Sequence, residues 1–265
     1  MSMPPDRVIR AFGRSGVPQP LGGGSGTAWR VGSIVLKRAD MSASEIDWQA
    51  HVLATTRPHG VRLVLPLRSA EGMFVVEGWI ATPYVDAVHE PRRWLDILAV
   101  GRRLAAGLAG VPRPAFLDVR RTPWDVADRV AWGEEAIEGT GRYPHIDALA
   151  RLRQPIDSSG QVIHGDLTGN VLFAAGLAPA IIDFVAYWRP AAYMGAIVIA
   201  DALVLESAPD DVVANLDGGP DAPQFLVRAL LFRAIADVLR QPGPDPAAAV
   251  APFAHAVDIA RSLVT

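Results

Sequence analysis

The sequence predicts an α+β fold in two parts, a β-rich part over residues 1–85 and a helical part over residues 86–265. Short apolar runs punctuated by glycine dominate the first 85 residues and are typical of strands and turns. From residue 90 the apolar residues recur at helical spacing instead. A small group of strands, over residues 161–184, interrupts the helical part.

The β-rich part begins with "PLGGGSGTAWRVGSIVLK", residues 20–37, which predicts a glycine-rich turn and two short strands, 28–31 and 33–37. Residues 41–56, "MSASEIDWQAHVLATT", space their apolar side chains as a helix does, and Ser42 or Ser44 can cap it. Residues 61–86 predict two further strands around a turn at Glu71–Gly72.

The helical part begins with an amphipathic stretch at 91–111. A second helix, 122–137, has Thr122 as its cap and Pro123 at its first helical position. Two more helices are expected over 224–240 and 246–264. Between the helix at 122–137 and these last two, strands at 162–163 and 171–173 flank a polar loop, and a third strand follows at 180–184.

Composition limits the class of protein. Half of the 265 residues are hydrophobic, a fifth are charged and the net charge is −3, which is typical of a globular protein and disfavours a nucleic-acid partner. No apolar run reaches the 18 residues of a membrane span, and the first residues lack the apolar core of a secretory signal. Cysteine is absent from the chain, which excludes disulfides and thiol catalysis. We therefore expect a cytoplasmic protein without a membrane partner; the oligomeric state stays open.

The polar loop reads "HGDLTGN", residues 164–170, and "IIDF", residues 181–184, follows it. A turn rich in Asp, Gly and Asn can serve local backbone hydrogen bonds alone. The preceding histidine and the later aspartate in an apolar strand favour a functional site instead. Together these residues resemble the catalytic loop and metal-binding strand of the aminoglycoside phosphotransferase and choline kinase family. The resemblance implies a bilobed protein-kinase-like fold that transfers the γ-phosphoryl group of ATP, or of GTP, to a small-molecule hydroxyl with Mg²⁺.

The resemblance also implies a role for each polar residue. Asp166 matches the base that orients the acceptor hydroxyl and takes its proton, while Asn170 and Asp183 match the Mg²⁺ ligands. An ionised Asp183 beside Ile181, Ile182 and Phe184 is costly unless a cation is near. His164 is expected to fix the loop through backbone hydrogen bonds rather than to move protons. Asp201, on a following helix, is expected to brace the loop.

Lys37 is the sole lysine among 25 basic residues. It ends a strand that follows the glycine-rich turn, where the resemblance places a lysine that holds the nucleotide phosphates. Glu45, on the next helix, is expected to pair with it. The alternative is that Ser42-x-x-Glu45 forms a capping box and that Glu45 only closes the helix start.

The rest of the nucleotide site is less specific. Gly23, Gly24 and Ser25 are expected to form a flap over the phosphates, although the turn lacks the P-loop pattern and a plain hairpin turn is an alternative. Backbone groups from Ala81 to Tyr84 are expected to hold the adenine. Pro83 has no N–H, so the register of those contacts stays open.

The acceptor is not specified by any motif. Residues 201–217 carry five carboxylates and no Lys or Arg, so a cationic acceptor such as an amino sugar, aminoglycoside or amino alcohol is one hypothesis. A solvated acidic loop is the alternative. Val185 replaces the glycine of protein kinases, which disfavours a protein substrate. We predict a small-molecule kinase. The rival interpretations are a nucleotide-binding pseudokinase with a regulatory role and a metal hydrolase that uses His164 and Asp166, which lacks the clustered histidines of such sites.

Overall fold

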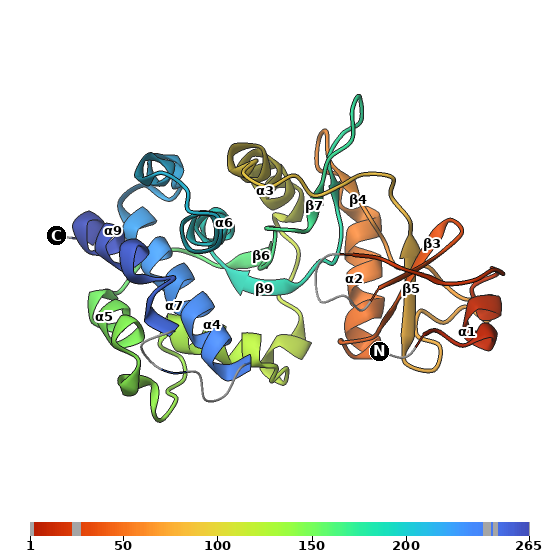
Figure 1. The fold of residues 1–265 in the computed structure, drawn as a ribbon, viewed down its shortest axis with the longest axis horizontal. Helices are drawn as coiled ribbons and strands as arrows, with labels where there is room; N and C mark the ends of the chain where they lie inside the picture. The colour runs from red at the N-terminus through yellow and green to blue at the C-terminus, as the bar shows by residue number, and fades with distance from the viewer. Residues whose placement is uncertain (1–2, 23–27, 241–244, 246–248, 265) are drawn as a thin grey trace. The chain divides into compact units, whose positions relative to one another are not determined.

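A computed structural model describes residues 3–22, 28–240, 245 and 249–264 (Figure 1). Its contacts divide the chain into two compact units, and each is described here by itself. The first unit contains Met1–His89 and Gly169–Phe184, and the second contains Glu90–Thr168 and Val185–Thr265. The sequence prediction placed residues 169–184 in the helical part, 86–265. In the structure they belong to the first unit. The segment with Asn170 and Asp183 therefore packs with the N-terminal strands.

An antiparallel sheet in the order β1-β2-β3-β5 organises the first unit. Its strands are β1 (Gln19–Pro20), β2 (Trp29–Val31), β3 (Ile34–Arg38) and β5 (Trp79–Pro83). Because side chains alternate along a strand, the sheet has two faces. One packs against α1 (Asp6–Ala11) through Leu36 and Ala81. The other carries Ile80, which packs with Ile46 of α2 (Ala43–Thr55).

A second, three-stranded sheet carries the C-terminal segment of this unit. Strand β4 (Arg62–Leu63) pairs in parallel with β8 (Ala180–Ile181), which pairs antiparallel with β7 (Val171–Leu172). The two strands expected around the turn at Glu71–Gly72 are present as β4 and β5, but they do not pair with each other, because they belong to different sheets. Pro66 lacks an N–H for a ladder, and Glu77 (φ 50°) and Gly78 (φ 75°) turn the chain immediately before β5.

The second unit is mainly helical. Its helices are α3 (Trp94–Leu108), α4 (Pro123–Trp132), α5 (Pro144–Leu152), α6 (Ala191–Leu205), α7 (Ala222–Arg240) and α9 (Ala254–Val264). Short 3₁₀ turns occur at Ala115–Asp118, Thr140–Arg142, Asp210–Asn215 and Gly219–Asp221. Helix α7 is buried along most of its length and contacts α4, α5, α6 and α9 (Figure 1). It is the central element of this unit.

Local signals fix the helix ends. At α4, Thr122 and Asp125 form a reciprocal capping box, Pro123 occupies the first turn and Gly133 ends the helix with φ 77°. The predicted cap and proline positions are therefore confirmed. None of the described helices combines the length and apolar character needed to cross a membrane.

The two strands that flank the polar loop do not pair with each other. Strand β6 (Gln161–His164) pairs antiparallel with β9 (Ala186–Arg189) in the second unit. Strand β7 pairs with β8 in the first unit. The loop from Gly165 to Asn170 thus connects the two units along the chain.

Candidate functional site

His164 holds the start of the polar loop. Its side chain is fully buried, and Nδ1 accepts hydrogen bonds from the backbone amides of Asp166, at 3.2 Å, and Val185, at 3.4 Å. One imidazole thus satisfies two backbone donors on two chain segments. This contact supports the structural role proposed for His164, since the nitrogen that faces the loop accepts from backbone.

Gly165 allows the loop to pass close to β9. Its amide donates to the carbonyl of Val185 at 3.0 Å. A Cβ atom built at residue 165 would lie 2.3 Å from two ring carbons of Tyr187, which is buried. The place of Gly165 between His164 and Asp166 was a signal for this close approach that was missed from the sequence.

Asp166 lies in an ion-pair cluster with two residues from different helices. Arg233 of α7 donates from Nη2 to Oδ1 of Asp166 at 2.9 Å. The same guanidinium donates from Nε and Nη2 to the two carboxylate oxygens of Asp201, on α6, each at 2.6 Å. Asp201 is 1% exposed, whereas Asp166 is 44% exposed. The cluster therefore has a buried acid at one end and an accessible one at the other.

The opposite charges in this cluster stabilise one another's ionised forms. Burial raises the pKa of Asp201, and the Arg233 guanidinium opposes that shift. Burial likewise disfavours the charge of Arg233, but Asp201 and Asp166 hold its pKa above the usual value. Sequence reasoning expected Asp201 to brace the loop but missed Arg233, through which Asp201 reaches Asp166.

In the first unit, Lys37 and Asp183 come together from positions 146 residues apart. Lys37 Nζ lies 2.6 Å from Oδ1 of Asp183. Lys37 pairs directly with Ile80 across the sheet, so both side chains lie on the face that packs with α2. Asp183 has φ 49°, an uncommon backbone conformation for a residue other than glycine.

Asn170 and Asp183 lie at the same end of the β7–β8 ladder. The amide of Ile182 donates to the carbonyl of Asn170 at 3.0 Å, which extends the pairing of Val171 with Ile181 by one step. The residue after Ile182 is Asp183. The Asn170 amide and the Asp183 carboxylate are thus carried at neighbouring positions of the two chain segments. Their oxygen atoms are ligands that suit a hard cation such as Mg²⁺. Among the described residues, no three His, Cys, Asp or Glu side chains form a metal-binding group.

Helix α2 contributes two buried polar side chains, Glu45 and Gln49, spaced one turn apart. Gln49 Nε2 donates to the carbonyl of Phe184 at 2.8 Å, which ties the helix to the residue after Asp183. Sequence reasoning missed Gln49, although a polar residue on an apolar helix face was a usable signal. Ser42 caps the helix by accepting from the Glu45 amide at 3.2 Å. The Lys37–Glu45 pair stays a prediction.

The remaining nucleotide-site residues are only partly described. Gly23, Gly24 and Ser25 lie outside the described residues. Ala81 is buried in β5, and its carbonyl accepts from the Leu67 amide at 2.8 Å. The amide of Tyr84 donates to Ser33, also at 2.8 Å, and its ring lies 3.7 Å from the Arg30 guanidinium. Adenine contacts at Ala81 and Tyr84 stay a prediction.

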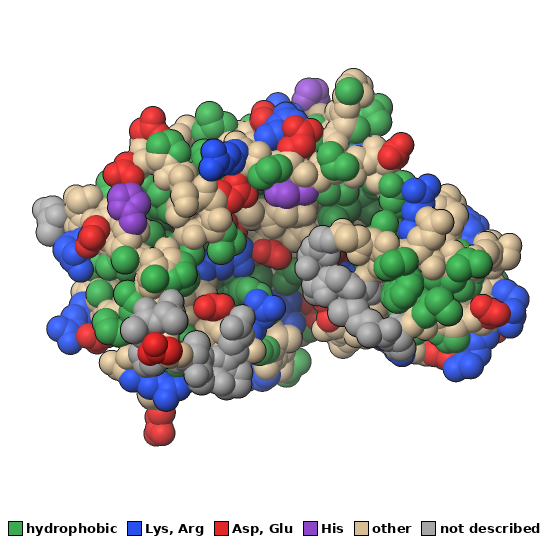
Figure 2. All heavy atoms as spheres, viewed as in Figure 1, with side chains coloured by type: hydrophobic (Ala, Val, Ile, Leu, Met, Phe, Trp, Pro, Cys, Tyr) green, Lys and Arg blue, Asp and Glu red, His purple; other side chains and the backbone are tan. Residues whose placement is uncertain are grey.

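The acidic stretch 201–217 is largely paired within the chain. Four of its five carboxylates have described partners: Arg233 for Asp201, the Arg92 amide and Trp94 indole for Glu206, His255 for Asp210 and Arg102 for Asp217. On the face shown in Figure 2, acidic and basic side chains are interspersed. The stretch therefore gives little reason by itself to expect a cationic acceptor.

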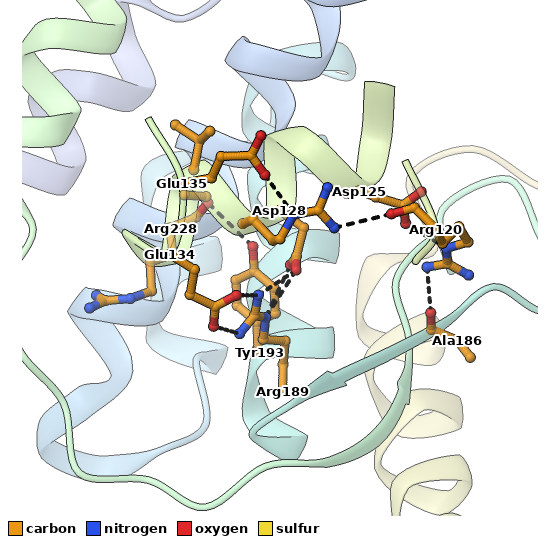
Figure 3. Close-up of polar contacts among 12 residues, drawn as sticks. Arg120, Asp125, Asp128, Glu134, Glu135, Ala186, Arg189, Tyr193 and Arg228 are labelled. Atoms are coloured by element: carbon orange, nitrogen blue, oxygen red, sulfur yellow. Dashed lines mark hydrogen bonds and ion pairs between the residues drawn. The ribbon is translucent and has the colours of Figure 1, made fainter. Parts of the chain in front are cut away.

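A second ion-pair network joins α4 to the end of β9 (Figure 3). The Arg189 guanidinium lies between the carboxylates of Asp128, at 2.6 Å, and Glu134, at 2.9 Å. Burial raises the pKa of Asp128, and Arg189 opposes the shift. Two guanidinium groups lie near the Trp132 ring, that of Arg189 at 4.6 Å and that of Arg228 at 5.2 Å from its centre. This network holds the strand that lies beside His164.

No family model and no curated protein matches the chain. Solved structures do match over nearly its whole length. Spectinomycin phosphotransferase APH(9)-Ia, in complex with ADP and spectinomycin, has a TM-score of 0.64 at 14% identity and covers 99% of both chains. An aminoglycoside phosphotransferase from Alicyclobacillus acidocaldarius has a TM-score of 0.65 at 12% identity, covering 100% of this chain and 95% of that one.

The chain has the aminoglycoside phosphotransferase fold. A choline/ethanolamine kinase family protein from Mesorhizobium loti shares it, with a TM-score of 0.57 at 16% identity and 98% coverage of both chains. The predicted α+β, kinase-like fold class is therefore confirmed. At these identities the likeness concerns the fold, and the roles of the individual residues depend on the geometry above.

Proposed function

We propose that the chain is a small-molecule kinase that transfers the γ-phosphoryl group of ATP to a hydroxyl of a small acceptor. The observation that carries the proposal is the 2.6 Å contact between Lys37 and Asp183, with Asn170 at the end of the same hairpin. An ammonium and a carboxylate 146 residues apart in the sequence are in contact in the first unit, and a side-chain amide is carried at the end of the adjoining strand ladder. That combination suits a triphosphate with its divalent cation.

The proposed roles follow from charge and position. Lys37 is 17% exposed and lies on the sheet face toward α2, so its ammonium can neutralise phosphate oxygens in a partly dry environment. Asn170 and Asp183 would hold Mg²⁺, which when bound neutralises charge on the triphosphate. Asp166, accessible and held by Arg233, would orient the acceptor hydroxyl and take its proton.

Known ligands of the fold support ATP as the donor. Spectinomycin phosphotransferase was solved with ADP and with AMP, and APH(4)-Ia with AMP-PNP and hygromycin B. Those structures also contain spectinomycin or hygromycin B, and another structural neighbour belongs to the choline/ethanolamine kinase family. We therefore propose a hydroxyl-bearing small molecule as the acceptor. The paired acidic stretch does not extend the proposal to a cationic one.

A direct test is the formation of ADP from Mg²⁺ and ATP in the presence of candidate acceptors. Spectinomycin, hygromycin B, choline, ethanolamine and a panel of neutral sugars and polyols cover the main classes. We expect acceptor-dependent ADP formation in the wild type. Asp166→Ala should lower kcat by at least about 10²-fold, the lower range for loss of a general base.

Two results would contradict the proposal. If Asp166→Ala forms ADP at the wild-type rate, Asp166 is not the base. If the wild type binds ATP but forms no ADP with any acceptor, the pseudokinase interpretation replaces the kinase. Circular dichroism of both proteins controls for folding.

A further inference from the structure

Arg233 of α7 links Asp201 of α6 to Asp166 of the polar loop through hydrogen bonds to both carboxylates. Its guanidinium makes two hydrogen bonds to Asp201 and one to Asp166. Sixty-seven residues separate it from Asp166 along the chain. The sequence motif around Asp166 does not predict this arginine. The contact between Arg233 and the loop is therefore identified only from the structure.

The surroundings of Arg233 fix the direction of its guanidinium. Asp201 is almost fully buried, so an ionised carboxylate there needs a paired cation. Because the two partners share two parallel hydrogen bonds, the planar fork has one orientation. The rings of Phe232 and Trp124 lie 5.2 and 5.5 Å from its central carbon. The guanidinium is thus held by a buried acid and lies beside two aromatic rings, in addition to its contact with Asp166.

Asp166 is the member of the cluster that an acceptor hydroxyl could reach. Arg233 Nη2 reaches Oδ1 of Asp166, whose side chain is 44% exposed, at 2.9 Å. The amide of Asp166 is held independently by His164. Backbone and carboxylate are therefore anchored from two sides. A base that must meet a hydroxyl within hydrogen-bond distance gains from such anchoring, because small misplacements are costly for rate.

We infer that Arg233 is a positioning residue for the reaction: buried Asp201 orients its guanidinium, which in turn orients the Asp166 carboxylate toward the acceptor. This inference rests on the proposed kinase function. Lysine cannot replace it in full, because an ammonium lacks the fork that serves two carboxylates at once. Removal of the guanidinium should therefore lower turnover and leave nucleotide affinity unchanged, since Arg233 is not in the proposed phosphate and metal set.

The chain offers a matched control on the same helix. Arg228 is 4% exposed and lies five residues before Arg233. Its guanidinium donates to Gln224 and to the carbonyl of Gln154. Arg228→Met removes a buried arginine from α7 without touching Asp166. It should lower the melting temperature but keep kcat within about twofold of the wild type.

The experiment measures ADP formation from ATP with the best acceptor of the panel, or with water if none is preferred, in the wild type and in Arg233→Ala, Arg233→Lys and Arg228→Met. We expect kcat to fall about 10²-fold in Arg233→Ala with an unchanged KM for ATP, and by less in Arg233→Lys. Added guanidinium chloride at low millimolar concentration should restore part of the Arg233→Ala activity. It should restore none in Asp166→Ala.

Each outcome decides the inference. A folded Arg233→Ala variant with kcat within twofold of the wild type overturns it, and so does a loss of activity matched by Arg228→Met. If Arg233→Ala fails to fold, Asp201→Leu combined with Arg233→Met removes both buried charges together, a change that proteins often tolerate. A folded, fully active double variant overturns the inference, and a folded, slow one supports it. A wild type that forms no ADP under any condition overturns the proposed function itself.

Discussion

Lys37 illustrates what the sequence can predict about a single functional residue. One of the chain's 25 basic residues is a lysine, and this lysine forms an ion pair with Asp183. An ammonium is a compact point charge, whereas arginine is a planar fork, so the two are not interchangeable at a crowded phosphate. The strand position of Lys37 was readable from sequence. The contact of Lys37 with Asp183 was not, because Asp183 follows β8, which belongs to a different sheet from the strand of Lys37.

Gly165 carries a prediction about loop packing at the scale of a single residue. Gly165→Ala should destabilise the protein by about 1–3 kcal/mol, the usual cost of overpacking, because the new methyl group would overlap the buried Tyr187 ring. Urea unfolding measures the change. Gly141→Ala is the control: a Cβ there meets no atom within 4 Å, so little change is expected. Equal stabilities of the two variants would show that the loop can move away from β9.

Individual elements explain which contacts could be anticipated. Helix α4 was predictable from Thr122, Pro123 and Gly133, since caps and prolines act within one turn. The pairing of β4 with β8 was not, because it joins residues more than a hundred positions apart and each strand is only two residues long. Two residues carry too little periodicity to identify a partner.

The packing of α5 against α9 predicts a pH dependence of stability. His145 of α5 is buried and stacks on Phe253, with ring centroids 5.1 Å apart. Burial lowers the pKa of His145 below its usual 6.5, and Asp237 partly opposes the shift. As the pH falls below 6.5, the unfolded chain takes up the proton first. The free energy of unfolding should therefore decrease, by at most about 1.4 kcal/mol per pH unit from this group.

Urea unfolding at pH 7.5 and 5.5 tests that pH dependence. The variant His145→Phe keeps an aromatic ring beside Phe253 and removes the titrating group. Its loss of stability between the two pH values should be smaller than that of the wild type. Identical losses in both proteins would mean that His145 does not contribute to the pH dependence.

For the molecule as a whole, local sequence motifs identified the candidate site residues better than the residues that hold them in place. The loop around Asp166 and the segment around Asp183 were identified because their polar residues interrupt apolar strands. Arg233 and Gln49 were missed because each acts over a long sequence separation, 67 residues to Asp166 and 135 to Phe184. Their helices carry no pattern that names those partners. The α+β class followed from the order of strands and helices, and the kinase-like fold followed from the resemblance of the motifs at 164–170 and 181–184. The comparison with solved structures confirms both.

We propose that Lys37, Asn170 and Asp183 form the site for a triphosphate and its cation. Calorimetric titration with AMP-PNP, with and without Mg²⁺, tests it most directly in the wild type, Lys37→Met and Asp183→Asn. We expect the wild type to bind AMP-PNP at least about tenfold more tightly with Mg²⁺ than without it, a difference of about 1.4 kcal/mol. We also expect loss of that gain in Asp183→Asn and weaker binding in Lys37→Met. Undiminished, Mg²⁺-dependent binding by folded Asp183→Asn would contradict this proposal.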